Sequence, residues 1–479
     1  MSGFRYNGVH SSTYGMNVLA VRRGILPPIT AQLLEVPGRP GGYYQGRQLG
    51  TRTIAVDVQL VARDYADLRS KVRSIAAWLQ PGTEPRDLVF DDEPGLTWRA
   101  VLSGSTDLDE IVAVGKGTLQ FLCPDPVALG DEHVLSLGVG GEAVVTAGGT
   151  APAWPVIRAT VQQPITYLTV ATPDRYVLLG RPEAVEETPA ERETMVLHDT
   201  CASLAGWGPA TEVLNGIATG TMTTNGAAFY PSDYGSGSGW HGPAIKRSIP
   251  QAPLQDFRVD VLVSQHNLTG QTGRAEVYLL DENGVIVGMI SVRDRWESEK
   301  RVEARALMGN AAGQKDIWVG QAAVPHHWNQ FDGIMRLERV GTTWVAYWAK
   351  IDQTGRHHTR KYVRVVDEAR AFQAPIAQVV VWLSKYANTQ NTNQSISDIK
   401  IWRINNMAPT QVPYIAMPGD VVEIDCERHA VYLNGEPRLD LLDPTSQFFS
   451  LPPGQPVTVG VEPAGAVTGV ELAYRERWL

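Results

Sequence analysis

Short runs that alternate apolar and polar residues fill the last sixty positions of the chain. Residues 422–427 alternate aliphatic or cysteine side chains with acidic ones. This period-two pattern is typical of a strand with one solvent-exposed face. An Asn-Gly pair at 434–435 accepts the positive φ angles of a tight hairpin turn, and further strands are predicted at 457–461 and 470–479. About four strands are too few to close a sandwich. We therefore expect their partners at 135–179, with everything between inserted into one domain.

The first 130 residues predict a β-rich domain with one helix. The run 53–61 alternates aliphatic with polar residues and is the clearest strand. Apolar residues then recur at threes and fours, which predicts an amphipathic helix that begins near Asp64, its N-cap. Further strands are predicted at 87–90, 97–102 and 117–123. The stiff Pro-Asp-Pro segment at 124–126 suits a domain boundary.

Regularly spaced strands also fill residues 195–405. Turn signals such as Asp-Glu-Asn-Gly at 281–284 and Val-Gly-Thr at 340–342 separate them, and no convincing long helix interrupts them. This spacing predicts a two-sheet β-sandwich. The acidic, extended stretch after Pro182 indicates a solvated linker in front of it.

Composition narrows the function classes. The chain has 479 residues and a formal net charge of −9, so no basic field for nucleic acid is expected. Cys123, Cys201 and Cys426 are far apart and form no C-x-x-C pattern, which indicates buried thiols and no disulfide framework or zinc site. The sequence shows no export signal and no apolar run of about 18 residues. We expect assembly in a reducing cytosol, without membrane insertion.

Both ends of the chain resemble siphophage distal tail proteins. At the N-terminal end, the predicted helix is followed by Leu-Val-Phe-Asp-Asp (88–92), Trp-Arg-Ala-Val-Leu-Ser-Gly (98–104) and Gly-Thr-Leu-Gln-Phe-Leu-Cys-Pro-Asp-Pro (117–126). The C-terminal end adds the Asn-Gly hairpin, a Phe-x-Leu-x-x-Gly turn at 449–454 and the terminus Arg-Glu-Arg-Trp at 475–478. The order of these segments carries the resemblance, since no single one is a catalytic motif.

This resemblance implies a mainly β protein of the virion, at the distal end of the phage tail and assembled in the host cytoplasm. Residues 1–130 would form a split-barrel-like belt domain that makes a homohexameric ring. Residues 131–186 and 412–479 would form a galectin-like β-sandwich, interrupted at 187–411 by a carbohydrate-binding module. The expected partners are other copies of the chain, the tail tube protein, tail-associated or baseplate proteins, and host cell-wall polysaccharide.

The pattern of residues 187–411 resembles the concanavalin-type jelly rolls of lectins and carbohydrate-binding modules. Trp-His-Gly-Pro at 240–243 opens the resemblance and Ser-Asp-Ile-x-Ile at 397–401 closes it. Sugars present apolar C–H faces and a rim of hydroxyls, so a binding site needs an exposed aromatic ring beside hydrogen-bonding groups. Trp344, Trp348 and Trp402 stand among apolar neighbours and are expected to fill the core. The candidate carbohydrate-binding residues are Trp240, His241, Arg295, Trp296, Trp382, Tyr386, Asn388 and Asn391.

Catalysis is not expected. The nearest approach to a glycosidase carboxyl pair, Asp294 with Glu297 and Glu299, lies in a charged run that indicates a solvated loop. Adjacent histidines at 326–327 and 357–358 would point to opposite faces of a strand, which disfavours a shared metal. No cofactor is expected; such modules can hold a structural calcium ion, but no ligand-spaced loop is visible. The rival hypotheses are a purely structural baseplate part, whose insert contacts other tail proteins, and a polysaccharide-degrading enzyme.

Overall fold

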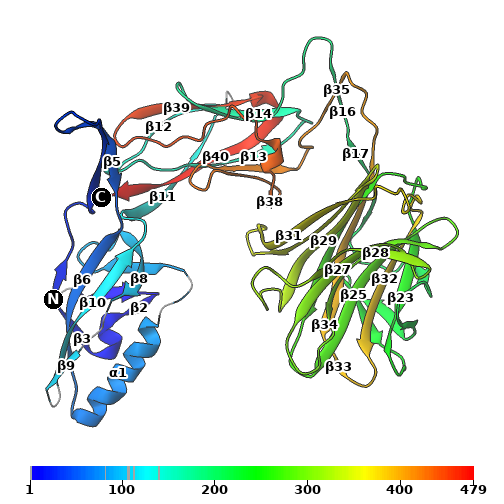
Figure 1. The fold of residues 1–479 in the computed structure, drawn as a ribbon, viewed down its shortest axis with the longest axis horizontal. Helices are drawn as coiled ribbons and strands as arrows, with labels where there is room; N and C mark the ends of the chain where they lie inside the picture. Colours follow the sequence, from blue (N-terminus) through cyan, green and yellow to red (C-terminus); the bar gives the residue numbers. More distant parts are fainter. Residues whose placement is uncertain (1–2, 81, 83, 105–107, 112–113, 139–140) are drawn as a thin grey trace.

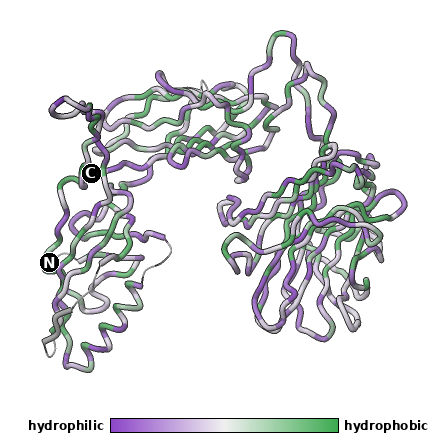
Figure 2. The backbone as a smooth tube through the Cα atoms, in the orientation of Figure 1, coloured by the Kyte–Doolittle hydropathy of each residue, from purple (hydrophilic) through white to green (hydrophobic). Residues whose placement is uncertain are grey.

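The computed structural model describes residues 3–80, 82, 84–104, 108–111, 114–138 and 141–479, and its architecture is mainly β. Figure 1 shows three bodies in succession: an N-terminal body, a middle body that contains the C-terminus, and a third body joined to the middle one by two extended segments. The mainly β fold expected from the sequence is confirmed. In Figure 2 the hydrophobic stretches of the third body run along its strands, and hydrophilic residues gather at its loops.

The N-terminal body packs strands against one α-helix. Its elements are β1 (Phe4–Tyr6), β2 (Val9–His10), η1 (Ser11–Tyr14), β3 (Met16–Arg22), β4 (Ile29–Glu35), β5 (Gly42–Leu49), β6 (Arg52–Val61), α1 (Tyr65–Leu79), β7 (Arg86–Phe90), β8 (Thr97–Ser103), β9 (Leu108–Ile111) and β10 (Val114–Cys123). The alternating aliphatic residues Ile54, Val56, Val58 and Leu60 of β6 are all buried, as the pattern predicts. The Asp64 side chain accepts a hydrogen bond from the Asp67 backbone N–H at 2.8 Å, which confirms the predicted N-cap.

Strands β4 and β5 form a separate two-stranded hairpin, which we call the arm. They pair only with each other within the described part of the chain. Almost every arm residue is exposed, including Leu33, Leu34, Tyr43 and Tyr44. An isolated two-stranded hairpin is marginally stable in water. The arm therefore presents apolar surface that no other described part of the chain covers.

Strands from both ends of the sequence build the middle body, which we call the split domain. Its elements are β11 (Ala128–Ser136), β12 (Glu142–Thr146), β13 (Val156–Val161), β14 (Tyr167–Ala171), β15 (Tyr176–Gly180), β36 (Val421–Asp425), β37 (Ala430–Leu433), β38 (Glu436–Pro437), η2 (Leu439–Leu441), β39 (Pro456–Glu462), η3 (Ala464–Ala466) and β40 (Val467–Trp478). β11 pairs with β40, β12 with β39, and β13 with both β36 and β40. Ile157 thus lies between Ile424 and Leu472, and all three are buried in one core.

The third body, Glu193–Ile404, lies between these two sets of strands in the sequence, and we call it the insert. Two extended segments lead into and out of it, and they pair in parallel as β16 (Thr188–Ala190) and β35 (Gln411–Pro413). This two-stranded ribbon is the neck of the insert (Figure 1). Because both sides of the neck continue into the split domain, the chain leaves that domain and returns to it at the same place.

The insert is a sandwich of two sheets whose long strands pair antiparallel. Sheet A has the order β20-β21-β34-β24-β29-β30-β31, with β17 also on β34, and sheet B has the order β18-β23-β32-β25-β26-β27-β28. The elements are β17 (Glu193–Asp199), β18 (Gly208–Pro209), β19 (Ile217–Ala218), β20 (Thr221–Thr224), β21 (Phe229–Asp233), β22 (Trp240–Gly242), β23 (Ala244–Ser248), β24 (Phe257–His266), β25 (Gln271–Leu280), β26 (Ile286–Asp294), β27 (Val302–Asn310), β28 (Gly313–Gly320), β29 (Phe331–Val340), β30 (Thr343–Ile351), β31 (His357–Val366), β32 (Gln378–Tyr386), β33 (Gln390–Asn391) and β34 (Asn393–Ile404).

Alternation along each strand divides the insert into a core and two outward faces. Val277 on β25 and Leu337 on β29 belong to one buried cluster between the sheets. Their neighbours in sequence, Glu276 and Arg336, therefore belong to the outward faces of sheets B and A respectively, because successive strand residues point to opposite sides. These two faces lie on opposite sides of the sandwich.

Candidate functional site

The outward face of sheet B carries charged residues in rows that cross the strands. Registry between β32, β25, β26 and β27 aligns one row of Ser384, Arg274, Arg293 and Glu303, and a second row of Trp382, Glu276, Ser291 and Arg305. The alternate residues of these strands face the apolar core. Seven of the eight residues in these two rows are therefore charged or hydroxylic side chains on an otherwise apolar sheet.

Burial and ion pairing hold these rows in place. Arg293 Nε lies 3.0 Å from Glu303 Oε1, and Arg295 Nε donates to the same carboxylate oxygen. Burial lowers the pKa of Arg293 to about 10, although Glu303 opposes that shift. Burial likewise lowers the pKa of Arg274, whose Nε–H has no hydrogen-bond partner within the described chain. The face therefore keeps guanidinium groups with unused donors close beneath its surface.

Two of the residues predicted from sequence meet at the edge of this face. Trp240 on β22 pairs with Tyr386 at the end of β32, and their rings pack edge to face with centroids 5.4 Å apart. The Arg274 guanidinium lies over the Trp240 ring, 3.9 Å from its centroid. Tyr386 keeps 45% of its surface exposed. An open aromatic ring thus stands beside a buried cation at the margin of the charged rows.

Trp296 and Arg295 lie at the same end of the sheet, just after β26. Strand β25 separates β26 from β32, so this end of β26 lies about 10 Å from Tyr386. Trp296 is 37% exposed, with the Arg301 guanidinium 4.7 Å and the Arg295 guanidinium 5.7 Å from its ring centroid. The two aromatic groups therefore flank one end of the charged rows.

Asn388 and Asn391 follow Tyr386 in the loop that turns back into β34. Both are exposed, and Asn391 pairs with Thr272 of β25 through the short strand β33. The Thr389 hydroxyl lies 2.7 Å from the Thr272 hydroxyl, which holds the loop against β25. Side-chain amide groups are consequently presented beside the Tyr386 ring.

The remaining two candidates are buried. Trp382 has no exposed surface, and its indole N–H donates to the Gly242 carbonyl at 3.0 Å, which corrects its selection as a candidate carbohydrate-binding residue. It lies on the outward side of sheet B, where residues 210–218 cover it as part of a second apolar cluster. His241 is 2% exposed, and its Nδ1 lies 2.8 Å from the Gly239 carbonyl oxygen. Neither side chain is available to a ligand at the surface.

The three tryptophans that were expected in the core also differ in burial. Trp344 and Trp348 are fully buried between the sheets, which confirms the prediction for both. Trp402 is only half-buried and lies under the Arg258 guanidinium, 4.0 Å from its ring centroid, so the core assignment was wrong for this residue. Ile399 and Ile401 of β34 face the core. Trp402, the residue after Ile401, therefore lies on the outward face of the sheet.

Sequence reasoning did not select the charged rows. Their signal is present as pairs of polar residues two positions apart in strands that are otherwise apolar: Arg274 and Glu276, Ser291 and Arg293, Glu303 and Arg305. Period-two placement puts each pair on one face of a strand. Recognising the site also requires the pairing of β25, β26 and β27, which aligns the three pairs.

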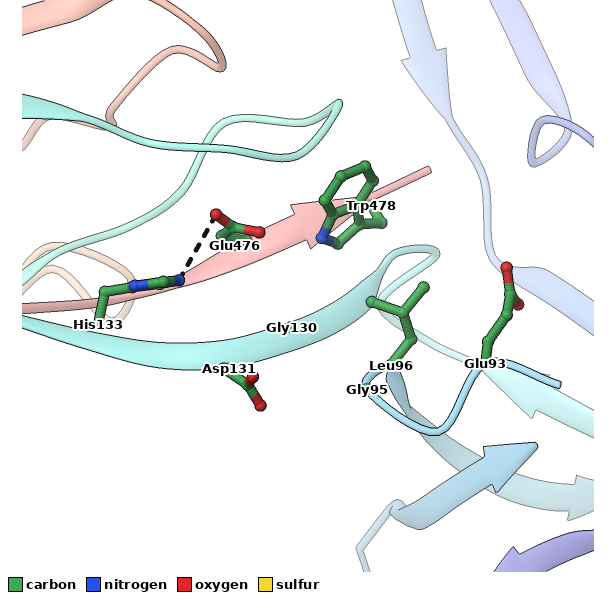
Figure 3. A pocket seen from close by; sticks show the side chains of 8 residues that line it. All are labelled: Glu93, Gly95, Leu96, Gly130, Asp131, His133, Glu476 and Trp478. Carbon is green, nitrogen blue, oxygen red and sulfur yellow. Dashed lines mark ion pairs between the residues drawn. The ribbon is translucent and has the colours of Figure 1, made fainter. Parts of the chain in front are cut away.

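A separate open pocket of about 520 Å³ lies where the N-terminal body meets the split domain (Figure 3). Its lining residues are Glu93, Gly95, Leu96, Gly130, Asp131, His133, Glu476 and Trp478. Figure 3 shows His133 and Glu476 on neighbouring strands, with Nε2 and Oε1 3.5 Å apart, and the loop of Glu93 on the opposite side. None of the residues predicted from sequence to bind sugar lines this pocket.

The described residues contain neither a candidate metal site nor a candidate membrane-spanning helix. No group of three or more histidine, cysteine or acidic side chains is arranged to hold a metal ion there. In the same residues, no helix is long and apolar enough to cross a bilayer.

Two family models match the chain. Residues 9–123 match the phage tail protein RIFT-related domain, and residues 384–478 match the C-terminal domain of the siphovirus-type tail component. No curated protein matches. Both matched models describe tail-protein domains, and neither describes an enzyme.

Three solved structures illustrate the structural similarities. The CBM2 module of the evolved Dit of Lactobacillus casei BL23 phage J-1 is 16% identical, with a TM-score of 0.40, 46% of this chain and 99% of that chain covered. The SPP1 Dit protein, described as a paradigm of the hub adsorption apparatus in phages that infect Gram-positive bacteria, is 21% identical, with a TM-score of 0.34, 38% of this chain and 75% of that chain covered. The exoplasmic domain of VIP36 with bound Ca²⁺ and Man2 is 10% identical, with a TM-score of 0.29 and coverage of 43% and 84%.

The order of the two matched domains, one at each end of the chain, is the order that the sequence motifs predict. The strands of the C-terminal match complete a sheet with strands from before the insert. The chain is therefore identified as a siphophage distal tail protein with a β-sandwich inserted between its two end segments.

Proposed function

We propose that this chain forms a ring at the distal end of a phage tail and that its insert binds host cell-surface polysaccharide during adsorption. The observation that carries the binding proposal is the pair of Trp240 and Tyr386, an aromatic edge that stays open beside the buried guanidinium of Arg274. We assign residues 1–130 to the ring, 131–186 and 412–479 to a galectin-like domain, and 187–411 to the binding module.

The chemistry of this edge suits a sugar. The exposed Tyr386 ring offers an apolar face to the C–H groups of a pyranose. The amides of Asn388 and Asn391 and the cation of Arg295 offer donors and acceptors to its hydroxyls, and all three side chains are exposed. A shallow site of this kind binds a single sugar weakly. Several copies on one ring would make each later contact effectively intramolecular and raise the overall affinity by about 10²–10⁴.

The arm supports ring formation. Leu33, Leu34, Tyr43 and Tyr44 are all about half exposed on a hairpin that pairs with no other described strand. Exposed apolar patches of this kind commonly mark protein–protein interfaces. A neighbouring copy is the partner that a closed ring supplies to every arm in turn. Assembly in the host cytoplasm, contact with the tail tube and contact with other baseplate proteins belong to the same proposal.

The carboxylates on the outward face of sheet B argue against the alternative that the insert is a polysaccharide-degrading enzyme. Glu303 is ion-paired with Arg293 and accepts a hydrogen bond from Arg295, and Glu276 accepts a hydrogen bond from the Tyr278 hydroxyl. Carboxylates engaged in this way are poor candidates for the free acid and nucleophile of a retaining glycosidase. Incubation of host polysaccharide with the protein would reveal cleavage as new reducing ends, and we expect none.

A labelled full-length chain tests the binding proposal. Fluorescent full-length protein is incubated with cells of the host bacterium, and wild type is compared with Tyr386→Ala and with Tyr362→Ala. Tyr362 is an exposed tyrosine on sheet A, away from the proposed edge, so its substitution controls for nonspecific binding through any exposed aromatic ring. We expect wild type and Tyr362→Ala to decorate the cell wall and Tyr386→Ala to fall to background. Absence of labelling by folded wild type would remove the adhesion function, leave the ring in place and favour a purely structural baseplate part.

A further inference from the structure

The outward face of sheet A carries a different charged cluster, and this one contacts the split domain. Arg336 on β29 donates to both oxygens of Asp260 on the neighbouring strand β24, at 2.6 and 2.9 Å. The same guanidinium donates to both oxygens of Glu436 on β38 of the split domain, at 2.8 Å each. One arginine is therefore held by two carboxylates, one in each body, with the bidentate geometry that makes such pairs strong.

Neighbouring contacts extend this interface. The turn between β30 and β31 meets the hairpin of β37 and β38, and the His357 backbone N–H donates to the Gly435 carbonyl at 3.0 Å. Arg356 in that turn pairs with Glu423 on β36, and its guanidinium lies 4.7 Å from the Tyr432 ring centroid. Both contact points thus join sheet A of the insert to strands β36, β37 and β38 of the split domain.

The charged side chains at the centre of this interface are mostly buried. The side chains of Arg336 and Asp260 are 11% and 10% exposed, and that of Glu436 is 19% exposed. Burial alone would lower the pKa of Arg336, but Asp260 and Glu436 outweigh it and hold the pKa well above its ordinary value. Screening by salt is weak for partly buried pairs, so this contact differs from an ordinary surface ion pair.

The two faces of the insert consequently have different surroundings. Arg336 and Asp260 lie on sheet A and face the split domain, whereas Arg274 and Glu276 lie on sheet B. The outward faces of two packed sheets point in opposite directions, with the sheets about 10 Å apart. A contact made by one face therefore determines which way the other face points.

We infer that the cluster of Asp260, Arg336 and Glu436, with the turn of Arg356 and His357, is a latch that docks the insert on the split domain and turns sheet B away from it. The neck alone is a two-stranded ribbon of three residue pairs and allows the insert to swing. The latch adds a second point of attachment, so that every copy presents sheet B in the same direction. The latch fixes the orientation of the insert whether or not sheet B binds sugar.

Hydrogen exchange measured by mass spectrometry on the full-length protein tests the latch. The His357 amide is bonded to Gly435 only while the insert is docked, so its exchange reports docking. We compare wild type with Glu436→Gln, which removes one charge from the latch, and with Glu142→Gln, which removes an exposed charge from β12 of the same domain. We expect exchange in the peptide that covers residues 355–359 to be about tenfold faster or more in Glu436→Gln. Glu142→Gln should match wild type, and peptides from the buried strand β25 should be unchanged in all three.

Equal exchange of residues 355–359 in wild type and Glu436→Gln would overturn the latch. If exchange in β25 also rises in Glu436→Gln, the substitution has destabilised the insert as a whole, and a second pair of variants tests the latch. These are Gly435→Ala, which introduces a clash at the interface, and Gly454→Ala, which does not. A Cβ on Gly435 would lie 2.0 Å from the Gly355 carbonyl oxygen of the insert, whereas one on Gly454 meets nothing within 4 Å. The φ angles are similar, +79° and +69°, so backbone strain is matched. Faster exchange at 355–359 in Gly435→Ala alone supports the latch, and the same exchange in both variants excludes it.

Discussion

Trp240 and Tyr386 face each other across β22 and β32, with their ring planes inclined by 61°. The edge-to-face packing restricts the Tyr386 ring while leaving almost half of the residue exposed. A rigid open ring loses little entropy when a ligand binds. Tyr386 is therefore the side chain on which we expect binding at sheet B to depend most.

Trp382 lies four residues before Tyr386 on the same strand, and its substitution should act on stability. Trp382→Ala removes a fully buried indole, its hydrogen bond to Gly242 and its contact with Gly216. We expect a loss of about 3–5 kcal/mol in the free energy of unfolding of the insert. Tyr386→Ala should cost about 1 kcal/mol, the value of an aromatic pair. Denaturant unfolding followed by tryptophan fluorescence checks both, and equal losses would contradict the assignment of Trp382 to the core.

The arm should determine the oligomeric state. Tyr44→Asp places a charge where we expect a neighbouring copy to cover apolar surface, and burial of an unpaired charge costs several kcal/mol. We predict a folded monomer in light scattering coupled to size-exclusion chromatography. Val144→Asp, on a comparably exposed residue of the split domain, should leave the assembly intact. A ring that forms equally well with Tyr44→Asp would show that the arm does not make the contact.

Docking of the insert should weaken in acid. Burial raises the pKa of Glu436, but the charge of Arg336 and its hydrogen bonds outweigh burial, so the pKa lies below its ordinary value. Burial also raises the pKa of Asp260, and Arg258 and Arg336 outweigh it in the same way. A depressed acidic pKa contributes stability that is fully present above the ordinary pKa and is lost as pH falls through the depressed one. The loss should therefore lie below about pH 4.

Two neighbouring groups also change the pH dependence of docking. Burial lowers the pKa of His357, so its protonation also opposes docking as pH falls below about 6.5. Burial and Glu193 raise the pKa of Glu338, so its protonation acts in the opposite direction. Energy transfer between dyes on cysteines introduced at Asn283 and Val144 measures the separation of the insert from the split domain. Burial raises the pKa of the three native thiols to about 12, which keeps them from reacting with the dyes. A profile unchanged by Glu436→Gln would contradict the assignment of the acid transition to Glu436.

The sequence predicted the elements whose two faces differ. β6 alternates because one side meets the core, and α1 repeats at threes and fours for the same reason. The arm was not predicted, because both of its faces are exposed and no alternation marks it. The Pro- and Gly-rich run at 37–41 marks only the turn between its strands.

The candidate site was predicted only in part, for a related reason. Trp240 and Tyr386 stand out as aromatic residues among glycines and amides, and the fold brings them together. Trp382 has the same sequence context as Tyr386, yet residues 210–218 cover it. That cover comes from a segment more than 160 positions away and depends on tertiary packing alone. The Arg336–Glu436 contact joins residues 100 positions apart in different bodies, and the sequence contained no local signal for it.

The central claim, that the Trp240 and Tyr386 edge of sheet B binds the host polysaccharide, is tested most directly by calorimetric titration. Cell-wall polysaccharide purified from the host is titrated into full-length wild type, Tyr386→Ala and Tyr362→Ala. The account predicts saturable binding by wild type and Tyr362→Ala, and affinity reduced about tenfold or more in Tyr386→Ala, since 1.4 kcal/mol corresponds to a factor of ten. Equal binding by all three proteins, or no binding by any of them, would contradict it.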